Sequence, residues 1–89
     1  MDTDTIIQSL RNMAQENKTP ADMLRYMVLD LAIEQQVDLM KNFAEAFSLT
    51  LGEVTAISGW WHDDTAELND NDINVYMMPA LTSYLEAQS

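Results

Sequence analysis

Apolar residues recur at intervals of three and four positions along most of the chain, which is the spacing of one face of an α-helix. Three such stripes predict a helix over residues 4–16, a helix that opens at Pro20, and a helix that begins near Gln36. No glycine or proline separates the second stripe from the third, so the sequence leaves that boundary open. The three stripes consist of Ile6, Ile7, Leu10, Met13 and Ala14, then Met23, Leu24, Met27, Val28 and Leu31, then Leu39, Met40, Phe43, Ala44 and Phe47.

Capping residues mark where two helices begin. Thr19 is a good N-cap, and Pro20 fits the first helical position because a backbone N–H has no helical partner there. Thr50 and Glu53 have the spacing of a capping box, in which each side chain binds the other residue's backbone N–H. We expect Gly59 to end the short helix after Thr50 in the left-handed conformation that glycine readily adopts. The apolar positions of that short helix are Leu51, Val54 and Ile57.

A loop over residues 59–69 precedes the last helix, which is expected to begin at Asn69 or Asp70. With Asn69 as N-cap, Asp72 stands at the third helical position, where a negative charge favours the helix start. Pro79 removes one backbone hydrogen bond and predicts a kink after Met78. The apolar stripe of this helix consists of Ile73, Tyr76, Met77, Ala80, Leu81, Tyr84 and Leu85.

These elements predict an all-α fold, a compact bundle of four to five short helices. The chain has 89 residues, so we expect a single domain over residues 1–89 with one hydrophobic core. It contains no cysteine, which excludes a disulfide framework and a thiolate metal site. The N-terminus is acidic and no apolar run approaches about 18 residues, so we expect a cytoplasmic location and no contact with membranes.

Acidic residues outnumber basic ones by 15 to 4, which gives a formal net charge of −11. Residues 1–41 hold all 4 bases and 7 acids, a net of −3, whereas residues 42–89 hold 8 acids and no base, a net of −8. Binding to nucleic-acid phosphates requires lysine and arginine, so direct nucleic-acid binding is not expected. A protein this acidic is steered toward partners with a basic surface.

Candidate catalytic and metal-binding patterns fail on their spacing. Asp70, Asp72 and Asn74 have the opening rhythm of a calcium-binding EF-hand loop, but Val75 and Leu81 replace the glycine and the glutamate that the loop requires. The single histidine and the absence of cysteine do not provide a metal-ligand set, and no serine lies in a nucleophile motif. We therefore expect no enzyme activity, no metal and no cofactor.

The two adjacent tryptophans and the acids that follow them are the most informative feature for function. One of Trp60 and Trp61 is expected in the core and the other on the surface, where an aromatic side chain can anchor a protein partner. The run from His62 to Asp72 contains five acids, and a basic partner would relieve their mutual repulsion. Charge and expected exposure place the partner-binding surface on Trp61, Asp63, Asp64, Glu67, Asp70 and Asp72.

Three stretches carry a family resemblance: LMKNFAEAFSLTLGEV over residues 39–54, ISGWW over 57–61, and ELND over 67–70 with Ile73 after it. In these stretches the chain resembles small bacterial immunity proteins of polymorphic toxin systems, including partners of contact-dependent growth-inhibition toxins. The resemblance implies a cytoplasmic protein that binds and neutralises a cognate toxin. Many such toxins are nucleases with a basic cleft, which an acidic loop could occupy in place of phosphates. The matched positions expected in the core are Phe43, Phe47, Leu51 and Val54.

Two other classes of function stay open on the sequence. A phage-encoded inhibitor of a bacterial defence complex, such as an anti-CRISPR protein that mimics nucleic acid, would be small, acidic and helical for the same physical reasons. A small acidic adaptor would bind through its methionine and tryptophan surface, and its affinity would respond little to salt. An uncovered patch of this kind could also pair two copies of the chain weakly.

Overall fold

Helical segments account for most of the chain in a computed structural model that describes residues 3–63 and 65–88. Four are α-helices: α1 (Thr3–Gln15), α2 (Pro20–Arg25), α3 (Gln36–Phe47) and α4 (Asp70–Gln88). A π-helical segment, η1 (Tyr26–Asp30), continues α2, and a 3-10 helix, η2 (Gly52–Gly59), follows α3. Within the described ranges, the β-type pairing consists of a single bridge between Trp60 and Leu68. The predicted all-α fold is therefore confirmed.

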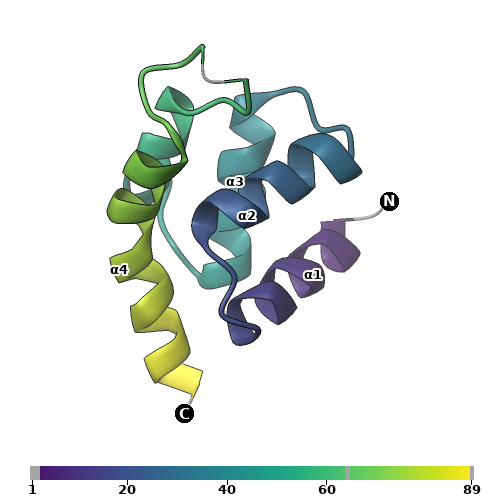
Figure 1. Ribbon diagram of the computed structural model, residues 1–89. Helices are drawn as coiled ribbons and strands as arrows, with labels where there is room; N and C mark the ends of the chain where they lie inside the picture. The colour runs from purple at the N-terminus through teal and green to yellow at the C-terminus, as the bar shows by residue number, and fades with distance from the viewer. Residues whose placement is uncertain (1–2, 64, 89) are drawn as a thin grey trace.

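The helices pack around one another so that distant parts of the sequence become neighbours. In Figure 1, α4 runs along one side of the molecule, α1 lies on the opposite side, and α2 lies in the middle in front of α3. The most extensive contacts join α1 to α3, η2 to α3, and α2 to α4. The pairing of α2 with α4 brings the half of the sequence that holds all 4 bases against the half that has none.

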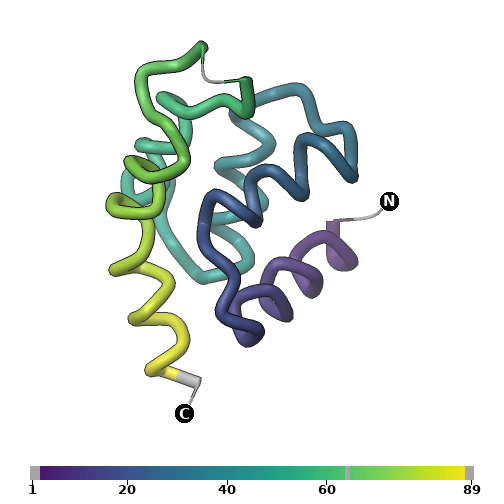
Figure 2. The backbone as a smooth tube through the Cα atoms, viewed as in Figure 1, coloured from purple at the N-terminus to yellow at the C-terminus, as the bar shows by residue number. Residues whose placement is uncertain are grey.

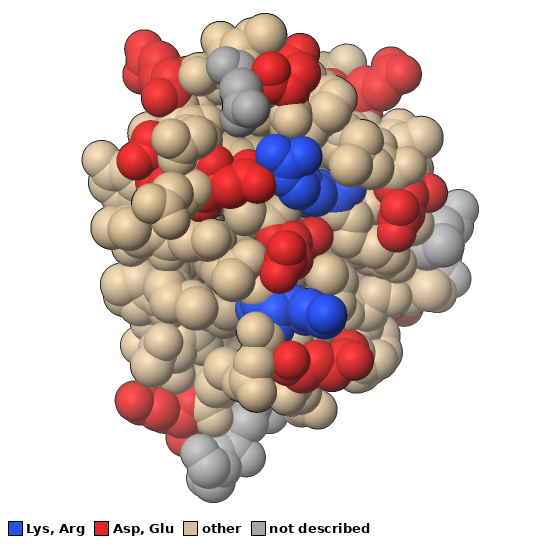
Figure 3. Space-filling view, viewed as in Figure 1, with Lys and Arg blue, Asp and Glu red and all other residues tan. Residues whose placement is uncertain are grey.

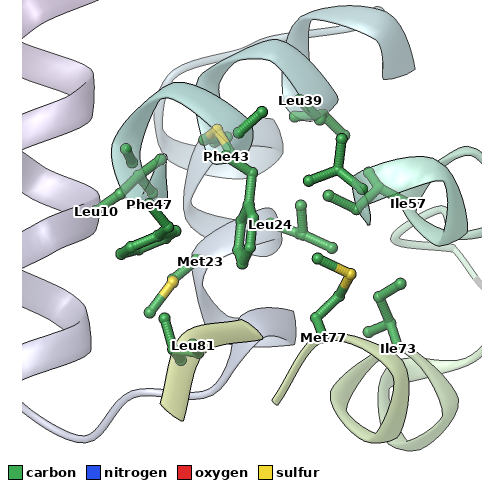
Figure 4. Close-up of a cluster of buried hydrophobic side chains, with 14 of the residues drawn as sticks. Leu10, Met23, Leu24, Leu39, Phe43, Phe47, Ile57, Ile73, Met77 and Leu81 are labelled. Atoms are coloured by element: carbon green, nitrogen blue, oxygen red, sulfur yellow. The ribbon is translucent and has the colours of Figure 1, made fainter. Parts of the chain in front are cut away.

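Buried side chains from every helix meet in one core (Figure 4). Phe43 lies at its centre with no exposed surface, and its ring packs edge-on against Phe47 with the centroids 4.9 Å apart. Phe47 makes a second edge-on contact, at 5.0 Å, with Tyr84 of α4. The stripes predicted for the first three helices supply most of this core, which confirms their helical periodicity. Met78, which falls off the stripe of α4, is 40% exposed.

The capping hydrogen bonds predicted for all three helix starts are present, although η2 begins at Gly52, one residue later than an N-cap at Thr50 predicts. The amide of Asp22 donates to the Thr19 hydroxyl at 3.2 Å, and the Asp22 carboxylate accepts from the Thr19 amide at 3.1 Å. Thr50 and Glu53 form the second capping box, in which the Thr50 amide donates to the Glu53 carboxylate at 3.1 Å. At the start of α4, the amide of Asp72 donates to the side-chain oxygen of Asn69 at 2.9 Å. These bonds are local, which is why the sequence could predict them.

The boundary that the sequence left open is a real break in the helix. Residues 31–35 are not helical, and Ala32 takes a left-handed backbone with φ of 56°. The widened turn of η1 ends there, with the Ile33 amide donating to the Met27 carbonyl at 3.0 Å. Ile33 packs against the core. The break thus depends on tertiary packing, because no local breaker residue causes it.

Two expectations about the segment around η2 are wrong. Gly59 does not adopt a positive φ. Its lack of a side chain instead permits a close approach, because a Cβ on Gly59 would lie 3.3 Å from the Cδ1 of Leu68. Leu51 was expected in the core but is 57% exposed, because the whole turn over residues 50–53 lies on the surface.

Pro79 lies inside α4, and the helix continues through it to Gln88.

Candidate functional site

The acidic loop, residues 60–69, connects η2 to the start of α4 and is held in place at both ends. Trp60 at its first position is fully buried, and its indole Nε1 donates to the Asp70 carboxylate at 2.9 Å. Near its other end, the Leu68 amide donates to the Gly59 carbonyl at 2.8 Å. The two ends of the loop therefore lie together, and residues 61–63 and 65–67 lie at one end of the molecule (Figure 1).

Arg25 of α2 connects this loop to the other half of the sequence. Its guanidinium forms a two-pronged ion pair with Asp70, at 2.7 Å from Nε and 3.0 Å from the second nitrogen. It also lies over the ring of Trp60, 5.8 Å from the centroid. The ion pair with Arg25, aided by the Trp60 hydrogen bond, lowers the pKa of Asp70 below its ordinary value. We therefore assign Asp70 to positioning the acidic loop, since both its oxygens are bonded within the fold.

Asp70→Asn is expected to weaken folding in a pH-dependent way. A carboxylate with a lowered folded-state pKa stabilises the protein above the unfolded pKa of about 3.9, and this contribution is lost as the pH falls through the folded value. The wild type should therefore exceed the variant by about 1 kcal/mol at neutral pH, a modest value because the ion pair is partly exposed. The two free energies of unfolding should converge below about pH 4.

Urea denaturation of both proteins at about pH 7 and about pH 3 measures this difference. Glu45→Gln, at an exposed site on α3, controls for the loss of one negative charge. A gap between Asp70→Asn and the wild type that stays constant over this pH range would show that the ion pair is not its cause.

The remaining acids of the predicted surface occupy different environments. Asp63 is exposed, and the hydroxyl and amide of Thr65 both donate to it, at 2.6 and 3.1 Å, which lowers the pKa of its carboxyl group. Glu67 is exposed. Asp72 is half-buried and accepts from the Asn69 amide at 3.3 Å, so it also caps α4. Asp64 lies outside the described residues.

Trp61 is the outward-facing tryptophan, as expected of one member of the pair. It is half-buried and packs edge-on against His62 with the ring centroids 5.1 Å apart. It also lines a shallow hollow of about 300 Å³ between the acidic loop and the segment before α3. Figure 2 shows that segment running toward the loop. An aromatic side chain at the edge of a hollow, among carboxylates, has the features of a protein-binding anchor.

Glu34 is a residue of this hollow that the sequence did not identify. It lies 27 positions before Trp61 in the chain. The side chain of Gln36 brings the two segments together, because its Nε2 donates to the carbonyls of Ser58 at 2.9 Å and Trp60 at 2.8 Å. Glu34 adds a fourth acidic residue to the exposed or half-buried group formed with Asp63, Glu67 and Asp72.

The chain has only 4 basic residues for 15 acidic ones. On the face shown in Figure 3, the lysine and arginine side chains lie near the middle and are bordered by acidic side chains. Within residues 3–63 and 65–88, Arg25 forms its ion pair with Asp70, which lies outside this group of four acidic residues. No group of three metal-ligating side chains occurs in the described part of the chain. The arrangement is suited to electrostatic recognition of a basic surface.

Comparisons of the chain with models of protein families, with curated proteins and with solved structures found no match. A functional proposal therefore depends on the surface described above and on the resemblance in sequence.

Among the described residues, no helix combines the length and the apolar character needed to cross a bilayer.

Proposed function

We propose that this protein is a cytoplasmic immunity protein that neutralises a toxin domain, of the nuclease type, by covering its basic surface. The observation that carries the proposal is the half-buried Trp61 at a hollow that Glu34 also lines, within a loop that carries the exposed Asp63 and Glu67 and leads to Asp72. Asp64, at the centre of the acidic loop in sequence, belongs to the proposed surface on its charge. Asp70 belongs to it as the residue that positions the loop.

The chemistry of such an interface follows from the charge of both partners. A nuclease cleft that holds phosphates is lined by lysine and arginine, and carboxylates of the acidic loop would occupy the same positions. Opposite charges raise the rate of association, and an inhibitor that protects a cell from its own toxin needs rapid capture. The aromatic ring of Trp61 would supply apolar contact at small cost in side-chain entropy.

A tagged pull-down from the native host, at low and at high salt, tests the proposal. We expect one basic companion, identified by mass spectrometry, that is retained at low salt and released at high salt. The affinity of the double variant Asp63→Lys, Glu67→Lys should fall by about 100-fold, because two attractions become repulsions worth about 2–3 kcal/mol together. The control, Glu16→Lys, Glu45→Lys, has the same net charge and should lose less than about threefold.

Equal losses for the two double variants would show that net charge alone drives binding, and would contradict a site on the acidic loop. A CRISPR or other defence complex as the captured companion, displaced by nucleic acid, would favour the phage-inhibitor function instead. Failure to retain any basic companion at low salt would contradict both kinds of inhibitor and favour the adaptor.

A further inference from the structure

An open groove of about 620 Å³ lies along α4 and shares no lining residue with the hollow at Trp61. One wall comes from the end of α3 and the segment that follows it, including Phe47 and Leu49. The other wall comes from α4 and includes Tyr76 and Tyr84. Tyr76 was expected on the buried stripe of its helix, yet it is 63% exposed. The groove is thus aromatic and accessible.

The groove continues the acidic surface along one face of α4. Residues separated by 4, 7 or 11 positions lie on the same side of an α-helix, so Asp72, Tyr76, Pro79 and Ser83 form one line. Tyr76, Pro79 and Ser83 all line the groove. With a rise of 1.5 Å per residue, the line from Asp72 to Ser83 is about 16 Å long. A single protein partner of ordinary interface size can cover both features.

The middle of α4 has the composition of an interface centre. Residues 73–85 include no charged side chain, although the chain as a whole has a net charge of −11. On the groove side this stretch exposes Tyr76, at 63%, whereas the exposed Met78 lines a different depression. Depletion of charge together with exposed aromatic residues distinguishes the centre of binding patches from ordinary surface.

We infer that this groove binds a basic amphipathic helix of a protein partner, with apolar side chains in the groove and lysine or arginine toward Glu53 and Asp72. Charge selects this occupant. Among the described residues that line the groove, Glu53 alone is charged, and residues 42–89 include no base. A second copy of the chain and an anionic membrane are both repelled. A groove that runs beside a helix suits a helical ligand.

This inference rests on the proposed function, because the partner that supplies the helix is the basic toxin. If the groove binds this helix, the toxin carries an apolar helix face next to its basic surface. The acidic loop would then govern association, and the groove would govern how long the complex lasts.

A synthetic probe tests the groove without the partner. The probe is a peptide of about 18 residues, made of leucine and lysine at helical amphipathic spacing, long enough to form a helix on binding. A scrambled peptide of the same composition has the same charge but no apolar face. We expect calorimetry to show binding at least about tenfold tighter for the amphipathic peptide. In NMR spectra of the labelled protein, it should shift the amides of Tyr76 and Ser83 more than those of the acidic loop.

Two neighbouring exposed residues provide matched variants. Ser83→Arg places bulk and positive charge in the groove, whereas Thr82→Arg makes the same charge change at a position that lines a different depression, beside Leu81 and Leu85. Ser83→Arg should weaken binding of the amphipathic peptide by at least about tenfold, and Thr82→Arg by less than about threefold. Circular dichroism checks that both variants fold, and if Ser83→Arg does not, the NMR map on the wild type decides.

Several results would overturn the inference. They are equal binding of the two peptides, equal effects of the two variants, and amide shifts confined to the acidic loop. A wild-type dimer in sedimentation that Ser83→Arg dissociates would assign the groove to a second copy. The proposed function fails separately, when no basic companion is captured from the host. A captured toxin that binds Ser83→Arg as tightly as wild type would leave that function standing and refute the groove as its docking site.

Discussion

Trp60→Ala is expected to lower the free energy of unfolding by about 3–5 kcal/mol, the range for removing a large aromatic side chain from a packed core. Trp60 has no exposed surface, and its indole N–H is bonded to Asp70. The substitution therefore leaves a cavity and removes a hydrogen bond that holds the acidic loop. A domain of this size has a total stability of about 4–13 kcal/mol, so the loss is a large share of it. Thermal unfolding should shift down by about 12 °C or more.

Trp61→Ala is the matched control, since it truncates the same side chain at the next position. Trp61 is only half-buried, so about 1 kcal/mol is expected for its loss. Its effect should instead appear as weakened binding of the partner. Equal losses of stability for the two substitutions would contradict the assignment of Trp60 to the core and Trp61 to the surface.

Phe43→Ala should destabilise the fold to a similar extent, by about 3–5 kcal/mol. Phe43 lies between α3 and its neighbours with no exposed surface, and its ring packs edge-on against Phe47, which in turn contacts Tyr84 (Figure 4). Removing the ring opens the centre of the core and ends one aromatic contact, which contributes beyond its buried area. Urea denaturation measures the loss, and near-ultraviolet circular dichroism reports the altered aromatic packing.

Val75→Ala on the exposed side of α4 controls for removal of an apolar side chain. Val75 is 72% exposed, so its truncation should change stability by no more than about 0.5 kcal/mol. Comparable destabilisation by Phe43→Ala and Val75→Ala would show that the core is not centred on Phe43.

Much of the candidate surface could be predicted from local sequence, and its organisation could not. The run of acids after Trp61 was visible as a pattern of charge. The partner of Asp70 was not, because Arg25 lies 45 positions away and reaches it only when α2 packs against α4. The position of Glu34 beside the loop could not be predicted for the same reason. The hydrogen bonds from Gln36 that bring its segment to the loop span more than 20 positions.

The sequence by itself determined the helices, their N-caps and most of the buried stripe, because these depend on interactions within one or two turns. It also determined the strong negative charge and the absence of any base after Lys41. The tertiary structure alone decided which tryptophan is buried, where the chain breaks at Ala32, and that Leu51 and Tyr76 face solvent. Each of these depends on which helix covers which face. Periodicity shows that a face is apolar but not what packs against it.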